Sequence, residues 1–243
     1  GTLEAGAGFI DAQNFAQTGG TLTGGGIFTI HGNGLVSGGT QTGSGVTVNT
    51  NSLRFASAGG ALGLARAYLN DTGATTTVTG PTLLLEGITL LNSGTLRLLD
   101  GGRIGGAAGG RVDNTASGVI EATGNGAGVL GAPTLTVNDG TLRSVAPLRI
   151  TAPTTTLSGS VTIDGAEVSF ASPSVTLQDG LSVSALNGGV FGLESGTVIA
   201  NSATLHTPIA AGPLGTFALG GSKTFTLAGG GAFAGTSFTR NNP

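Results

Sequence analysis

The chain has 243 residues and a formal net charge of −3; 48 residues are glycine and only 9% are charged. Glycine far exceeds its usual share of about 7%, but there is no Gly-X-Y period, so collagen is excluded, and the low charge excludes a disordered chain. Lys223 is the single lysine and the arginines form no basic cluster, so nucleic acid is not an expected partner.

The chain contains no cysteine, methionine or tryptophan, which excludes disulfides and Cys-based metal sites. Its longest apolar runs, such as 83–85 and 88–91, are too short for a membrane-spanning helix, so no transmembrane segment is expected. The sequence begins at Gly1 without an initiator methionine, and we expect it to be a processed or excised piece of a longer product.

The first sixty residues repeat a glycine corner. Gly-Gly pairs begin at Gly19, Gly38 and Gly59, at spacings of 19 and 21 residues. Between them lie short stretches rich in β-branched residues, 27–30 and 46–48, of a length suited to strands. Glycine permits the positive φ that a corner needs at the same place in every coil. For the segment 61–69 a short helical excursion and a pair of strands both stay open.

From about residue 81 to 122 each turn is followed by a short apolar run. An Asn-x-Gly-Thr-Leu element occurs at 92–96 and again at 138–142, with a looser copy at 114–120. Asn or Asp with glycine, followed by β-forming residues, predicts a turn and then a strand.

The block 132–191 contains the clearest period. Pro133, Pro153 and Pro173 lie twenty residues apart, and each precedes a similar run of Thr, Ser, Val and Leu. Alternation along these runs predicts an inward set, which comprises Leu135, Thr155, Val175, Val137, Leu157 and Leu177. The same alternation predicts an outward set of hydroxyl residues, which comprises Thr134, Thr136, Thr154, Thr156, Ser174 and Thr176.

These repeats predict an all-β fold, a parallel β-helix (β-solenoid) with coils of about 19–24 residues and three short strands per coil. Residues 1–200 are expected to form the β-solenoid. The period loosens over 201–243, where we expect loosened terminal coils or a cap, with coils that can continue beyond the fragment.

The glycine corners, the Asn-x-Gly-Thr-Leu elements and the cysteine-free Ser/Thr/Gly/Asn-rich composition resemble those of bacterial surface and secreted β-solenoids. These are the autotransporter passengers and the filamentous-haemagglutinin-like adhesins, and the resemblance covers residues 1 to about 200. It implies an extracellular or cell-surface location and a non-enzymatic role as an adhesin stalk or a surface-filament subunit. The implied partners are the protein itself, by end-to-end or lateral self-association, or host and matrix glycans and proteins.

Two other functions stay open. Asp139 and Asp179 occupy equivalent positions two coils apart, roughly 9–10 Å by stacking, which is near the upper end for the carboxylates of an inverting glycosidase. Both are also Asp-Gly turn pairs, which explains them without catalysis. The outward hydroxyl residues, in turn, form a regular face of the kind that ice-binding solenoids use. His31 and His206 lie far apart without acidic neighbours at metal-ligand spacing, so neither a metal nor another cofactor is expected.

Overall fold

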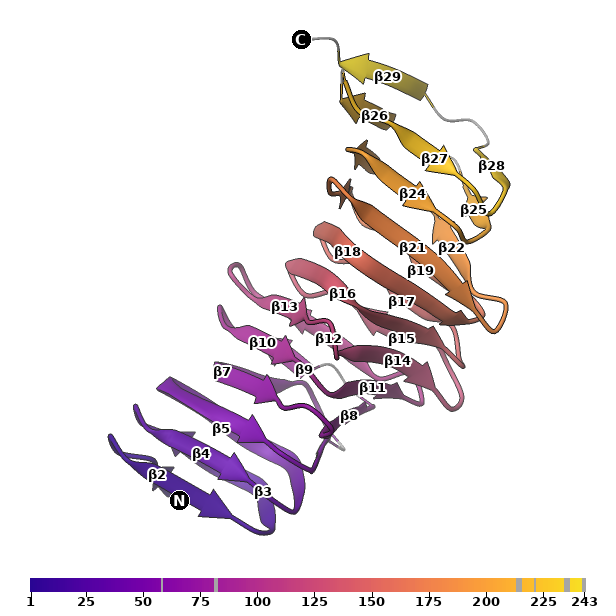
Figure 1. Cartoon of the computed structure of the whole chain (residues 1–243). Coiled ribbons are helices and arrows are strands. Elements are labelled where there is room, and N and C mark those ends of the chain that lie inside the picture. The colour runs from indigo at the N-terminus through magenta and orange to yellow at the C-terminus, as the bar shows by residue number, and fades with distance from the viewer. Residues whose placement is uncertain (58, 81–82, 213–215, 221, 234–236, 242–243) are drawn as a thin grey trace.

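The computed structural model describes residues 1–57, 59–80, 83–212, 216–220, 222–233 and 237–241. Throughout these ranges the regular structure is β-strand, and every paired strand runs parallel to its neighbour. The chain forms a β-solenoid of about ten coils of roughly 21 residues, which confirms the predicted fold class. The coils stack from the N-terminal end at the bottom of Figure 1 to the C-terminal end at the top.

Each full coil passes through three faces, here named A, B and C in chain order. Face A contains β2 (Phe9–Ala12), β4 (Ile27–Ile30), the end of β5 (Asn33–Asn49), the end of β7 (Leu62–Asn70), β10 (Thr89–Asn92), β13 (Arg111–Asn114), the start of β16 (Thr134–Ser144), the start of β18 (Thr154–Gly165), β20 (Ser174–Leu177), β23 (Thr197–Ala200), β26 (Thr216–Gly220) and β29 (Ser237–Asn241).

Faces B and C complete the coil. Face B contains β3 (Phe15–Thr23), the start of β5, β6 (Ser52–Ala56), β8 (Thr75–Thr79), β11 (Thr95–Leu99), β14 (Val119–Thr123), the ends of β16 and β18, β21 (Leu181–Leu186), β24 (Ala203–Leu205) and β27 (Phe225–Leu227). Face C contains β1 (Thr2–Glu4), the end of β3, the middle of β5, the start of β7, β9 (Leu83–Leu85), β12 (Arg103–Gly106), β15 (Gly128–Leu130), β17 (Leu148–Ile150), β19 (Glu167–Phe170), β22 (Val190–Leu193), β25 (Ile209–Ala211) and β28 (Gly231–Phe233).

Residues from the three faces that point inward make one long core. The inward set predicted for 132–191 is confirmed: its six members are fully buried, and they pair in register across three coils. The segment 61–69 lies in a strand from Leu62 onward and not in a helix, because β7 alternates buried and half-buried residues along its whole length. A strand with one buried side follows from this period of two.

The core of the first six coils contains a ladder of buried asparagines on face A. Asn49, Asn70, Asn92 and Asn114 occupy one column. The side-chain Nδ2 of each of the first three donates to the Oδ1 of the next, at 3.0, 2.7 and 2.7 Å. Each of the three also donates to a backbone carbonyl on face B. Buried amides are therefore satisfied by repetition, because the same group recurs at the same place in the next coil.

The repeated Asn-x-Gly-Thr-Leu element is not one structural unit. Asn92 belongs to the buried ladder, whereas Asn138 is exposed, because Val137 occupies the position that stacks on Asn114. The prediction of a turn holds at the second copy, where Asp139 and Gly140 have φ of 59° and 91°. At the first copy the chain bends at Ser93 and Gly94 and β11 follows, so the predicted turn and strand are present there too, while Asn92 itself lies inside the core.

Arg66 is a second polar group in the core of the early coils. It is 0% exposed and lies in β7 where face C passes into face A. Its guanidinium donates to the backbone carbonyls of Gly26 and Val46 at 2.7 and 3.1 Å, and to those of Gly24 and Thr42, each at 3.4 Å. Burial lowers the pKa of this guanidinium. A single side chain thus ties three successive coils together at one corner.

Beyond residue 200 the described strands continue the coil, since β24 to β29 pair in parallel on the same three faces. Part of the predicted terminal cap, including Asn242 and Pro243, lies outside the described residues, and the cap stays a prediction. Over the part of the chain described, no helix has the length and apolarity to cross a membrane.

Candidate functional site

Face A presents two outward columns of residues that run along the solenoid, here called the first and second outer columns. The first contains Phe9, Ile27, Val46 and Ala67 and, in later coils, Thr89, Arg111, Thr134, Thr154, Ser174, Thr197 and Thr216. The second contains Asp11, Thr29, Val48, Leu69, Leu91, Asp113, Thr136, Thr156, Thr176, Ile199 and Ala218.

In the later coils these columns form an uncharged surface, the hydroxyl array. It comprises Thr134, Thr136, Thr154, Thr156, Ser174, Thr176, Thr197, Ile199, Thr216 and Ala218. The six residues predicted to point outward are in register, and the array continues two coils further than the sequence analysis placed it. Within the described residues, its hydroxyls make no side-chain hydrogen bond to the protein. Neighbouring coils are about 4.8 Å apart and alternate residues of a strand about 6.6 Å apart, so the hydroxyls repeat at two fixed spacings.

In the earlier coils the same columns form an apolar stripe. It comprises Phe9, Ile27, Val46, Val48, Ala67, Leu69 and Leu91. Phe9 is 77% and Leu91 37% exposed, and the others are half-buried. This stripe was not predicted from the sequence. Its signal was present as alternation in Val46-x-Val48 and Ala67-x-Leu69, which places both members of each pair on one face.

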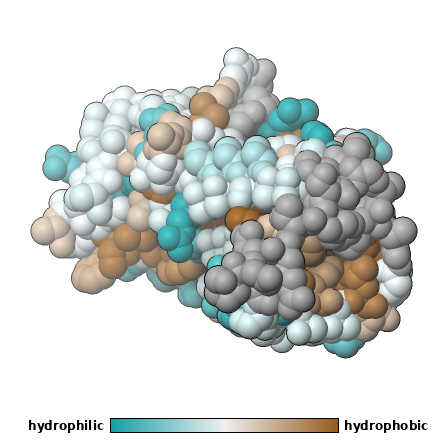
Figure 2. Space-filling view, turned by 90° about the horizontal axis from the view of Figure 1, so that it is seen from above, coloured by the Kyte–Doolittle hydropathy of each residue, from teal (hydrophilic) through white to brown (hydrophobic). Residues whose placement is uncertain are grey.

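Few charges lie on the outer columns of face A. Asp11 contacts His31 of the next coil at 3.2 Å. Arg111 and Asp113, in a single strand, form an ion pair of 2.5 Å, and this raises the pKa of the arginine. That ion pair lies between the apolar stripe and the hydroxyl array. Seen from above, the molecule shows pale, teal and brown areas side by side (Figure 2).

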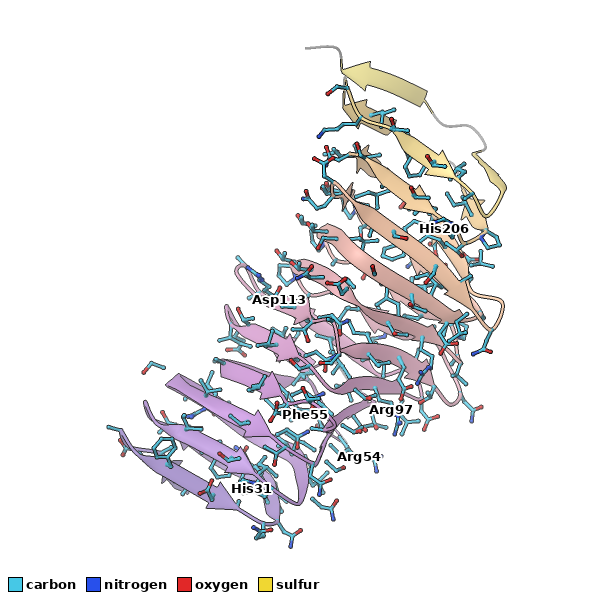
Figure 3. The ribbon with its side chains drawn as sticks, viewed as in Figure 1. His31, Arg54, Phe55, Arg97, Asp113 and His206 are labelled. Carbon is cyan, nitrogen blue, oxygen red and sulfur yellow. The ribbon has the colours of Figure 1, made fainter. Side chains whose placement is uncertain are left out.

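Face B contains a ladder of alternating charges. Arg97, Glu121, Arg143 and Asp164 form one column, joined by contacts of 2.6, 3.2 and 2.7 Å. The two carboxylate side chains are only 5% and 7% exposed. Hydrogen bonding from Arg143, followed by that from Asn187, lowers the pKa of Asp164. Figure 3 shows Arg97 on the opposite side of the solenoid from Asp113.

Other charged side chains reach across two coils. Arg149 contacts Glu194 and Lys223 contacts Asp179, both at 2.7 Å. Of the seven contacts between a basic and an acidic side chain found within the described residues, six join different coils, and only that of Arg111 with Asp113 lies within one strand. Most of this ionic chemistry therefore links coil to coil.

A surface hollow of about 360 Å³ beside Arg149 also contains two glutamates, Glu167 and Glu194, and Ser169. Ser169 donates to Glu167 at 2.8 Å. Arg149 binds Glu194 through three contacts and lowers the pKa of that carboxyl. A general acid needs a carboxyl whose pKa is raised toward neutrality, and Glu194 is shifted the other way. The hollow is explained as the setting of an ion pair between coils.

The two predicted carboxylates are both tied to turns. Asp139 accepts a hydrogen bond from the backbone N–H of Ser160 at 2.6 Å, and Asp179 accepts one from the N–H of Ser202 at 3.0 Å. Each carboxylate thus caps a turn in the following coil. Asp179 also contacts Lys223, and hydrogen bonding from this lysine lowers the pKa of the aspartate. Their turn role accounts for both residues.

The described residues contain no cluster of metal-ligating side chains. Over the described ranges no group of three or more His, Cys, Asp or Glu residues gathers at one place. His31 also lies near Thr50, with its Nδ1 3.3 Å from the threonine hydroxyl, so the imidazole bridges neighbouring coils.

No family model matches this chain, and no curated protein or solved structure matches it either. Its function must therefore be argued from its own surfaces.

Proposed function

We propose that the chain is a non-enzymatic structural or adhesive β-solenoid that acts outside the cell or on a bacterial cell surface. In this role it is an adhesin stalk or the subunit of a surface filament, as in the autotransporter passengers and filamentous-haemagglutinin-like adhesins whose repeats it resembles. Its working surface is face A, and its partners are matrix or host glycans and proteins or further copies of itself.

The observation that supports this role is the separation of charge from face A. The ion pairs of Arg97, Arg143 and Arg149 on faces B and C join separate coils, as does that of Lys223 with Asp179 at the turn between faces A and B. The outer columns of face A contain only Asp11, Arg111 and Asp113 as charged residues. Ion pairs between coils resist bending and unwinding of a rod. A face with so few charges can approach another flat surface while removing few charges from water, a removal that is costly.

Surface plasmon resonance against immobilised matrix glycans and proteins tests this proposal. Binding through face A should persist at high salt, because screening acts mainly on exposed charges. Thr156→Lys on the hydroxyl array should weaken binding, whereas the matched change Thr162→Lys, on the outer side of face B, should not. Equal loss in both variants, or binding that disappears at high salt, would refute the role of face A.

A second candidate function, ice binding, is favoured by one specific observation, the register of the hydroxyl array over five coils. Hydroxyls that make no bond to the protein are free to bind water, and their two fixed spacings would place the bound waters in rows. Uncharged threonine and serine, with methyl groups between the hydroxyls, suit such an ordered layer.

Thermal hysteresis separates this candidate from adhesion. An ice-binding protein would depress the freezing point below the melting point, and Thr156→Lys would abolish the gap while Thr162→Lys retained it. A solution of the wild-type protein that freezes and melts at one temperature would exclude ice binding.

A further inference from the structure

The apolar stripe and the hydroxyl array form one continuous surface on face A, and no described part of this structure covers it. Sheet faces of this kind pack on one another about 10 Å apart with their strands aligned. Exposed apolar areas of a few hundred Å² on a protein surface commonly mark an interaction site. Which occupant fits is decided by the pattern of residues in the two outer columns.

We infer that two copies of the chain pair side by side through face A, with their coil axes parallel and related by a two-fold axis that runs along the rods. This deepens the proposed function, on which it rests, by naming a second copy as the partner of the working surface. In a two-fold interface the same patch serves both copies, so the patch must be complementary to itself.

Charge provides the first test of self-complementarity. A two-fold axis along the rods places the first outer column of one copy against the second outer column of the other, at the same coil. Arg111 of each copy then faces Asp113 of the other, and the one ion pair that lies within a strand becomes two pairs between copies. In a fully overlapping antiparallel pair each column would face itself, and β13, the middle strand between β2 and β26, would face its own copy. Like charges would then oppose each other, so the charge pattern selects the parallel arrangement.

Size and hydrogen bonding agree with the same arrangement. Ala67 would face Leu69 and Thr197 would face Ile199, so a small side chain meets a large one. In three of the coils between, the two columns both contain hydroxyl residues. Those pairs are Thr134 with Thr136, Thr154 with Thr156, and Ser174 with Thr176. In these three coils each hydroxyl finds a partner when water is removed, which avoids the cost of a buried unpaired polar group. Elsewhere a threonine would face an apolar residue, as Thr29, Thr89, Thr197 and Thr216 do.

The available area matches a dimer of modest affinity. The ten coil steps between β2 and β26 span roughly 48 Å, and a strand of four residues is roughly 13 Å wide. Face A thus offers roughly 600 Å² per copy, or about 1,200 Å² in total, which is the lower limit for a specific stable interface. The apolar stripe supplies the hydrophobic part of this area.

Sedimentation equilibrium of the purified chain tests the pairing. The wild type should be a concentration-dependent dimer, and Val48→Lys with Leu69→Lys should weaken it about 100-fold or more, because four lysines would be buried without partners. Leu84→Lys is the matched control, since Leu84 is an outward leucine on face C between two glycines. Circular dichroism verifies that each variant is folded. A monomeric wild type, or equal weakening by the control, would overturn the inference.

A charge exchange tests the orientation separately, with the double variant Arg111→Asp and Asp113→Arg. In the parallel arrangement the double variant should dimerise with itself as the wild type does, but a mixed dimer should be disfavoured, because like charges would then face each other at both positions. In the antiparallel arrangement each position faces itself, so an equimolar mixture would favour the mixed dimer.

Native mass spectrometry of wild type mixed with an isotope-labelled double variant measures the share of mixed dimer. A share well below the statistical half supports the parallel arrangement, and a share at or above half would overturn it. A monomeric wild type that still binds immobilised matrix would overturn the dimer and leave the proposed function standing.

Discussion

The early and late coils of this solenoid are built in opposite ways. In the early coils the core includes asparagine, glutamine and arginine, and face A is apolar on its outer side. In the late coils the core is almost wholly aliphatic and aromatic, and the outer side of face A consists mostly of hydroxyl residues, with Ile199 and Ala218 as the exceptions. Both halves have the same three-faced coil. Their differences therefore show which residues of the core and of the outer surface can change while the coil is kept.

The comparison shows that polar ladders can be added to the apolar core of a coil. In both halves, burial of apolar side chains supplies most of the stability. In the early coils, amide ladders satisfy one another along the axis, and Gln17 and Gln41 repeat this device with a hydrogen bond of 3.1 Å. A polar core of this kind tolerates substitution poorly, because each group relies on its neighbours in the coils above and below.

The largest effect is expected from a charge placed in the late core. Leu157→Asp should lower the free energy of unfolding by about 3–5 kcal/mol, because an unpaired carboxylate would replace a fully buried side chain. Thr156→Ser, the adjacent outward residue, should change it by less than about 0.5 kcal/mol. Equal midpoints for the two variants in urea denaturation would contradict the assigned register.

A ladder asparagine should matter nearly as much in the early core. Asn92→Leu removes the donor to Asn114 Oδ1 and to the Val119 carbonyl, and should cost about 2–3 kcal/mol. Asn138→Leu is the matched control, because Asn138 belongs to the same sequence element but is exposed; it should cost less than about 0.5 kcal/mol. Urea midpoints for both variants give the comparison, and similar losses would remove the distinction between a ladder residue and a turn residue.

The charge ladder of face B should produce a smaller effect that depends on pH. The pKa of Asp164 is lowered in the folded chain, so the unfolded chain binds more protons in acid. The stability from this group is complete above the ordinary aspartate pKa of about 3.9 and is lost as the pH falls through the lower folded value. Arg143→Met should cost about 1–2 kcal/mol at neutral pH and reduce this acid sensitivity. An unchanged difference between wild type and variant from pH 7 to pH 3 would exclude the coupling.

The smallest effect is expected at the turn carboxylate. Asp139→Asn keeps the oxygen that accepts from Ser160, and asparagine tolerates the positive φ of this position, so stability should change by less than about 0.5 kcal/mol. Thermal unfolding measures this change. A loss above about 1 kcal/mol would mean that the negative charge, and not the hydrogen bond, is what this turn requires.

The sequence predicted the late coils well because their period is nearly constant there. The three prolines fix the alignment of Leu157 with Val137 and Leu177, and alternation then assigns the faces. The early and middle coils vary in length, so residues that stack in one column do not recur at a constant spacing in the sequence. In the charge ladder, Arg97 and Glu121 are 24 residues apart, while Arg143 and Asp164 are 21 apart. Variable corners account for the ladder that sequence reasoning missed.

Two interior groups could have been found from alternation alone. In β7, a period of two that buries Leu62 and Leu64 also buries Arg66 and Asn70. The rarity of a buried arginine concealed the first, and Asn70 belongs to none of the repeated sequence elements. Shared motifs mislead where the register shifts by one residue, as between Asn92 and Asn138, because one step moves a side chain to the other side of the sheet.

Small-angle X-ray scattering over a range of concentrations tests the central claim, that face A is the surface on which this rod associates. We expect the maximum dimension to stay at the length of one rod while the cross-sectional radius of gyration increases with concentration, and we expect Val48→Lys with Leu69→Lys to prevent the increase. A maximum dimension that grows in multiples of the rod length, with a constant cross-section, would show association through the coil ends and contradict the claim.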